Sequence, residues 1–145
     1  MKTAAKTEET IALMIWGQAL IAMLGSLFYS EVMGYIPCSL CWYQRILMYP
    51  LVAIYGVYAF KKDRELSITL PGLIMSGIGI IISTSHYLIQ KVPAFQDAGS
   101  SCGLVPCNAQ YVNYFGFITI PFMAGVAFLV IFILNIILFN KRRKA

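Results

Sequence analysis

Long apolar runs alternate with short polar segments along the chain. The apolar runs lie at about residues 11–33, 42–60, 67–89 and 115–139. A helix needs about 20 apolar residues to cross a bilayer core of about 30 Å. The pattern therefore predicts an all-α membrane protein: an antiparallel four-helix transmembrane bundle that forms one integral membrane domain over residues 1–145.

A cleaved signal peptide is the alternative interpretation of the first run. The apolar core of such a peptide has about 7–15 residues, and a small-x-small cleavage site follows it. Residues 11–33 exceed that length, and no such site comes after them. We therefore expect this run to remain as a membrane helix.

Composition supports a membrane location. The chain is 59% hydrophobic and 12% charged, whereas soluble domains have about 45–50% and about 25%. The net charge of +5 does not indicate nucleic-acid binding, because the basic residues cluster in short runs between the apolar segments and form no continuous basic face.

The positions of the lysines and arginines predict the topology. Nine of the eleven lie in the N-terminal tail, the charged turn at residues 61–65 and the C-terminal tail. Four spans place these segments on one side, which the positive-inside rule makes cytoplasmic, with both termini there. The segments 34–41 and 90–114 then lie outside. They hold all four cysteines, and the outside is where disulfides persist.

The first cysteine pair, Cys38 and Cys41, has the spacing of a redox dithiol and lies where the second span begins. A helix N-terminus favours a thiolate. Arg45 follows Cys41 by four residues, which places it on the same helix face, where its charge would further favour the Cys41 thiolate. The alternative interpretation is an interfacial arginine that reaches the lipid headgroups.

Two other ionisable residues lie near the predicted outer ends of spans. His86, the only histidine, is expected at the depth of Arg45, where it could carry or donate a proton near neutral pH. A histidine that bonds a neighbouring helix is the other interpretation. Glu31 could join this cluster or remain an interfacial carboxylate that faces water.

The second pair, Cys102 and Cys107, lies in the longer outer loop. It could be a mobile disulfide that reaches a partner and the first pair, or a structural disulfide that stabilises the loop. Haem attachment would need histidine directly after the second cysteine of the first pair, and Trp42 stands there. A four-thiolate zinc site fits the count, but the oxidising compartment argues against it, so we predict no metal.

The run Cys38-Ser-Leu-Cys41-Trp-Tyr-Gln-Arg45 resembles the C-x-x-C-hydrophobic-Tyr-Glu/Gln-Arg motif of the disulfide bond formation protein B (DsbB) family, and is most similar to its shorter, BdbC-type members. The resemblance covers nearly the whole chain. It includes the four spans, the two outer cysteine loops, the position of His86 and the Phe-Gly-Phe-x-x-x-Pro run that opens the fourth span at residues 115–121.

This resemblance implies a four-helix membrane bundle in the bacterial cytoplasmic membrane. It implies a thiol-disulfide oxidoreductase that reoxidises an extracytoplasmic thioredoxin-like dithiol oxidase. The electrons pass through the two cysteine pairs to a membrane quinone, menaquinone or ubiquinone. Such an enzyme supports disulfide bond formation in exported proteins.

The resemblance also implies roles for individual residues. Cys41 would be the cysteine nearest the quinone, Arg45 would contact a ring oxygen of the quinone, and His86 would lie close to it. Cys38 would exchange with the loop pair.

Within the loop pair, Cys102 would form the mixed disulfide with the partner and Cys107 would link to Cys38. Only four residues separate Cys102 from Cys107, whereas better-known members have a longer loop. Gln44 stands where those members carry glutamate, and we expect that difference to matter less.

Two rival functions fit the same pattern. A quinone-linked reductase similar to vitamin K epoxide reductase is also a four-helix bundle with two cysteine pairs, but its membrane-edge C-x-x-C lies on the last helix of the bundle. The other rival is a non-catalytic membrane subunit whose disulfides only stabilise its loops. In that case, the shared depth of Arg45 and His86 would be accidental.

Overall fold

The computed structural model describes residues 2–61, 67–100 and 102–144. Most of the predicted charged turn at residues 61–65 lies outside this described part. The elements, in chain order, are helix α1 (Lys2–Leu27), the short π-helix η1 (Phe28–Val32), and helices α2 (Ser39–Lys61), α3 (Thr69–Lys91), α4 (Pro93–Ser100) and α5 (Ile120–Lys144). The described residues thus form an all-helical chain, as the sequence predicts.

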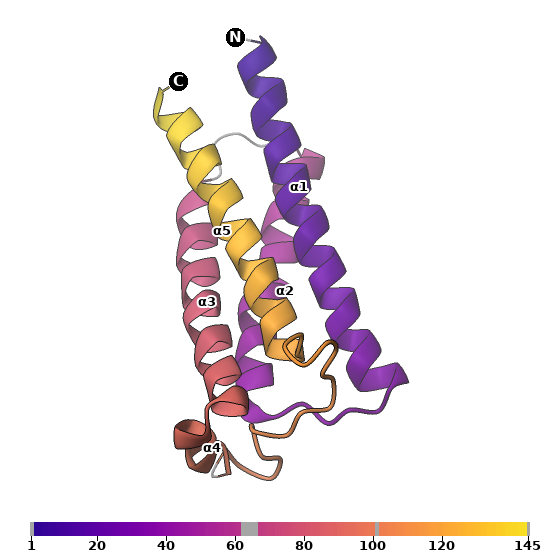
Figure 1. Ribbon diagram of the computed structural model, residues 1–145. Coiled ribbons are helices and arrows are strands. Elements are labelled where there is room, and N and C mark those ends of the chain that lie inside the picture. Colours follow the sequence, from indigo (N-terminus) through magenta and orange to yellow (C-terminus); the bar gives the residue numbers. More distant parts are fainter. Residues whose placement is uncertain (1, 62–66, 101, 145) are drawn as a thin grey trace.

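Four long helices lie side by side (Figure 1). Helix α1 packs against α2 and α5, and α3 packs against the same two neighbours. The two chain termini lie at one end of the molecule, while α4 and the connections before α2 and α5 gather at the opposite end (Figure 1). Both cysteine pairs are therefore carried by the same end.

Three of the described helical segments are long and apolar enough to cross a membrane: Lys6–Val32, which continues α1 through η1, Thr69–Lys91 and Ile120–Lys144. Helix α2 has 23 residues, which is also long enough. Its first turns carry Gln44 and Arg45, and these polar side chains lower its hydropathy. Both residues line a cavity.

Between α3 and α5 the chain differs from the sequence prediction in two ways. The fourth span was predicted to open at residue 115, but α5 begins at Ile120. Phe115 and Gly116 have φ angles of 54° and 83°, and a left-handed backbone cannot continue a right-handed helix. The second difference is α4, which lies within residues 90–114, where the sequence pattern predicts a loop.

One face of α3 carries a stripe of buried small residues that continues into the site. The buried residues recur every three or four positions and are, in order, Thr69, Gly72, Ser76, Gly79, Ser83, His86 and Gln90. Small residues let helix backbones approach closely in a membrane. At Gly79 the backbone approaches so closely that an added Cβ would collide with the ring of Phe128 on α5.

This contact predicts a difference between two glycines of one helix. Gly79→Ala should destabilise the fold by about 1–3 kcal/mol, the usual cost of overpacking a core. Gly77→Ala is the matched control, because the Cβ at that position would lie 3.6 Å from Phe132, an ordinary contact. Unfolding in detergent micelles measures both, and equal stabilities for the two variants would contradict the close packing of α3 on α5.

Candidate functional site

The first cysteine pair is held by the first turn of α2. The carbonyl oxygen of Cys38 accepts a hydrogen bond from the Trp42 backbone N–H at 3.1 Å. One helical turn thus separates Cys38 from Cys41, and their sulfur atoms lie 3.3 Å apart in hydrogen-bond contact. All four cysteines are in the thiol form. Hydrogen bonds from Cys41 and, to a lesser extent, from His86 lower the pKa of Cys38, because they favour its thiolate.

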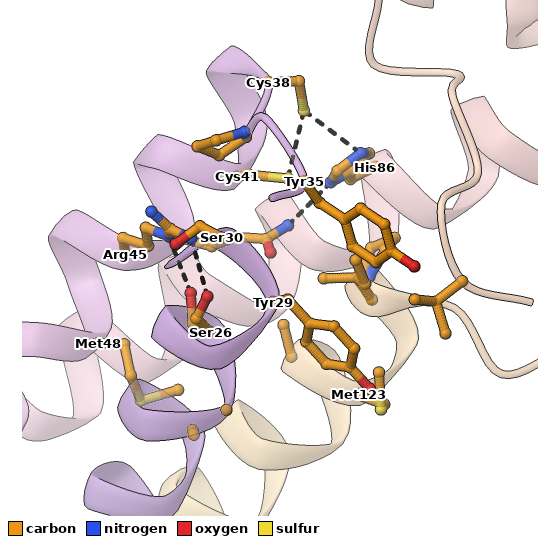
Figure 2. A pocket seen from close by; sticks show the side chains of 18 of the residues that line it. Ser26, Tyr29, Ser30, Tyr35, Cys38, Cys41, Arg45, Met48, His86 and Met123 are labelled. Carbon is orange, nitrogen blue, oxygen red and sulfur yellow. Dashed lines mark hydrogen bonds between the residues drawn. The ribbon is translucent and has the colours of Figure 1, made fainter. Parts of the chain in front are cut away.

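His86 joins the two cysteine pairs. It is 1% exposed and comes from the outer end of α3. Its Nε2 atom lies 3.7 Å from Cys38 Sγ and 3.1 Å from the carbonyl oxygen of Cys107. Its Nδ1 atom lies 3.2 Å from Nε2 of Gln44. Figure 2 shows the ring directed at the sulfur atoms of the first pair.

The second pair has one buried and one accessible member. Cys107 is 1% exposed, and its thiol interacts with those of Cys102 and Cys38. Burial raises the pKa of Cys107, because a thiolate is costly away from water. Cys102 is only half-buried, and its carbonyl oxygen accepts a 2.5 Å hydrogen bond from the Ser39 hydroxyl. The loop therefore presents one cysteine to the first pair and the other to the surface.

Hydrogen bonds hold the loop that carries the second pair. The backbone N–H of Cys107 donates to the carbonyl oxygen of Gly99 in α4 at 2.9 Å. Lys91 at the end of α3 donates to the side chains of Gln110 and Asn113 and, at 2.7 Å, to the carbonyl oxygen of Gly116. These contacts place Cys107 beside α2.

A cavity of about 390 Å³ opens beside the first pair, between α1, α2, α3 and α5 (Figure 2). Protein pockets that hold small organic ligands are typically about 300–1,000 Å³ and mostly apolar. The polar and sulfur-bearing residues of its wall include Ser26, Tyr29, Tyr35, Cys38, Cys41, Gln44, Arg45 and His86. Cys38, Cys41, Arg45 and His86, which the sequence predicted to work together, thus share one cavity.

Arg45 is fixed by helix α1. Its Nε donates to the hydroxyl of Ser26 at 2.8 Å, and its Nη2 donates to the backbone carbonyl of the same residue at 3.0 Å. The guanidinium carbon lies 5.5 Å from the ring centroid of Trp42, which is a cation–π contact. Within the described part of the chain, Nη1 has no hydrogen-bond partner, so this end of the guanidinium can bind a ligand.

Glu31 does not join this cluster. It is exposed, accepts a 3.5 Å hydrogen bond from the neighbouring Ser30 hydroxyl, and does not line the cavity. Its interpretation as an interfacial carboxylate that faces water stays a prediction.

A ladder of stacked tyrosines borders the cavity. The rings of Tyr29 and Tyr35 lie 6.1 Å apart and 11° from parallel, and those of Tyr35 and Tyr111 lie 5.0 Å apart and 12° from parallel. The ladder connects η1 with the connection between η1 and α2 and with the connection between α4 and α5. Sequence reasoning missed these rings and Ser26, because no local spacing relates residues that meet from different segments.

The cysteines do not assemble a four-thiolate metal site. In the part of the chain that the structure describes, the one group of candidate ligand atoms within 4.8 Å of one another comes from Cys38, Cys41 and His86. Cys102 lies outside this group.

The chain resembles known proteins over most of its length. The family profile described as "Disulfide bond formation protein DsbB" matches residues 8–138. The "Probable disulfide formation protein" of Oceanobacillus iheyensis is 63% identical over 100% of both chains. The "Disulfide bond formation protein C" of Bacillus subtilis is 55% identical over 88% of this chain and 91% of its own.

A third relative, the "Probable disulfide formation protein C" of Halalkalibacterium halodurans, is 49% identical over 95% of this chain and 99% of its own. No solved structure matches the chain. The profile and the relatives extend over nearly the full sequence, including both cysteine pairs. The chain therefore belongs to the DsbB family of disulfide bond formation proteins and is a membrane thiol-disulfide oxidoreductase.

Proposed function

We propose that this protein passes electrons from an extracytoplasmic thioredoxin-like dithiol oxidase, through its two cysteine pairs, to a membrane quinone. It would thereby reoxidise the partner and support disulfide formation in exported proteins. In this proposal, residues 1–145 form one integral domain of the bacterial cytoplasmic membrane. All four long helices cross the bilayer, both termini are cytoplasmic and the cysteines face outward.

The observation that carries the proposal is the order of the thiols between the surface and the cavity. Cys102 is accessible and contacts Cys107, Cys107 contacts Cys38, and Cys38 contacts Cys41. Cys41 lines the cavity together with Arg45. A disulfide that only stabilised the loop would not require Cys107 to be buried against the thiol of a second cysteine pair.

The exchange steps follow this order. A partner thiolate attacks Cys102 of the loop disulfide and releases the Cys107 thiolate, and the second partner thiol then displaces Cys102. The Cys107 thiolate attacks Cys38 of the first disulfide and releases the Cys41 thiolate. Finally, the Cys102 thiolate attacks Cys107, which restores the loop disulfide and releases Cys38. Two electrons and two protons have then moved from the partner to the first pair.

The cavity fits a quinone ring. Its volume and mostly apolar wall suit such a ligand, and the Nη1 group of Arg45 can donate to a ring oxygen. Cys41, whose side chain also lines the cavity, would face the bound ring. A bound quinone supplies a two-electron acceptor that returns Cys38 and Cys41 to the disulfide, while Ser26 keeps the Arg45 guanidinium in place.

The energetics favour an external acceptor. A strongly oxidising partner of the DsbA type has a potential near −120 mV, while structural disulfides lie below about −300 mV. The difference of about 180 mV corresponds to roughly 8 kcal/mol for two electrons. With potentials that low, the dithiol forms of the two cysteine pairs would reduce the disulfide of the partner, and the relay would run backwards. Either the two pairs have raised potentials, or a quinone removes the electrons and draws the relay forward.

The first prediction concerns Arg45. Purified protein, supplied with a reduced thioredoxin-like partner, should reduce quinone. Cys41→Ser should abolish this activity, and Arg45→Ala should lower kcat/KM for quinone at least tenfold, because a hydrogen bond to a charged group is worth about 1.5–3 kcal/mol.

Arg143→Ala, an exposed change at the other end of the molecule, is the control. Full activity of Arg45→Ala would refute the assigned role, and no activity in the wild type with several quinones would refute the proposed function.

The second prediction concerns the contact between the pairs. In the double variant Cys41→Ser/Cys102→Ser, mild oxidation should link Cys38 to Cys107 within one chain. The matched variant Cys38→Ser/Cys107→Ser retains Cys41 and Cys102, which lie at opposite ends of the thiol series and should remain free. Maleimide labelling and mass spectrometry count the free thiols. Equal disulfide yields in the two variants would contradict the proposed order.

A further inference from the structure

The two ring nitrogens of His86 have partners of different kinds. Nε2 lies 3.1 Å from the carbonyl oxygen of Cys107, and Nδ1 lies 3.2 Å from the side-chain amide nitrogen of Gln44. Both His86 and Gln44 are buried, with exposed fractions of 1% and 6%. The two partners together determine where the ring carries its hydrogen.

A carbonyl oxygen can only accept a hydrogen bond, so Nε2 must carry the hydrogen. Within the part of the chain that the structure describes, no carboxylate bonds to His86. The side-chain amide nitrogen of Gln44 can only donate, so Nδ1 accepts its hydrogen bond and carries no hydrogen. In a neutral imidazole the other nitrogen is an acceptor, and the N–H of the Gln44 amide satisfies it.

The Nε2–H group faces the place where the cysteine pairs meet. Cys38 Sγ lies 3.7 Å from Nε2, on the same side of the ring as the Cys107 carbonyl. One N–H can therefore be shared between that carbonyl and the sulfur of Cys38. The opposite tautomer would turn a lone pair toward both groups and lose both interactions.

We propose that Gln44 is a positioning residue for disulfide exchange: its amide holds His86 in the Nε2–H tautomer, so that this N–H donates to Cys38 Sγ where Cys38 and Cys107 exchange. The assignment of the tautomer stands on the geometry alone. Its role in exchange rests on the function proposed above.

The hydrogen bond from His86 would assist the step in which Cys38 leaves as a thiolate. The Cys102 thiol first loses its proton to water, which reaches this half-buried residue. The Cys102 thiolate then attacks Cys107 Sγ, the Cys38–Cys107 bond breaks, and its electron pair remains on Cys38. A hydrogen bond from Nε2–H stabilises the departing thiolate without transferring a proton.

An amide and a carboxylate at position 44 have opposite effects on whether Nδ1 of His86 carries a hydrogen. Glutamine can donate to an unprotonated Nδ1, as it does here, whereas glutamate can only accept and would require a hydrogen on Nδ1. Under this proposal, the identity of residue 44 matters more than the resemblance to glutamate-bearing family members implies. Gln44→Glu reverses the hydrogen bond with almost no change in side-chain size.

The single histidine allows a direct test. Nitrogen NMR of ¹⁵N-histidine-labelled, reduced protein should show Nδ1 unprotonated and Nε2 protonated in the wild type. Gln44→Glu should show Nδ1 protonated. Gln18→Leu changes another glutamine of the cavity wall and should leave the wild-type pattern. A protonated Nδ1 in the wild type, or an unprotonated Nδ1 in Gln44→Glu, would overturn the assignment.

The exchange rate tests the role. After dithiothreitol reduces the loop pair of the oxidised protein, timed maleimide quenching follows the appearance of thiols at Cys38 and Cys41. Gln44→Leu should slow this transfer about threefold to tenfold, the effect of weakening one hydrogen bond, with unchanged reduction of the loop pair. An unchanged transfer rate would refute the positioning role. Because this assay contains no quinone or partner, its result is independent of whether quinone is reduced.

Discussion

The hydrogen bonds of one buried imidazole hold this site together. A buried polar ring must find partners inside the protein, and His86 finds them on α2, through Gln44, and on the second outer loop, through the Cys107 carbonyl. The two hydrogen bonds of the ring therefore fix the positions of α2 and the loop relative to α3. Because α2 carries Cys38 and the loop carries Cys107, the same bonds place the two cysteine pairs against each other.

The packing of the helices makes this arrangement possible. The stripe of small residues on α3 lets α5 approach closely at Gly79, and the same helical face continues outward to His86 and Gln90. Toward the outer end the helices enclose the cavity instead of a filled core. The lower hydropathy of α2 has its explanation here, because Gln44 and Arg45 face the cavity and other protein groups.

The connections before α2 and α5 form parts of the site. Lys91 and α4 hold the loop that carries Cys107, and the stacked rings of Tyr35 and Tyr111 join the two loops. These contacts hold Cys107 while leaving Cys102 accessible, an arrangement that would suit the proposed relay to a separate protein.

The sequence by itself determined the helical class, the placement of all four cysteines at one end, and the cavity-lining residues Cys38, Cys41, Arg45 and His86. These follow from hydrophobic run length, charge distribution and helical spacing, which are local properties of the chain. Only the tertiary structure showed that Ser26 bonds Arg45, that Gln44 lies within hydrogen-bond distance of His86, and that α5 begins at Ile120. Such contacts depend on how each helix is rotated against its neighbours and on backbone angles in the loops, and no spacing along the chain encodes them.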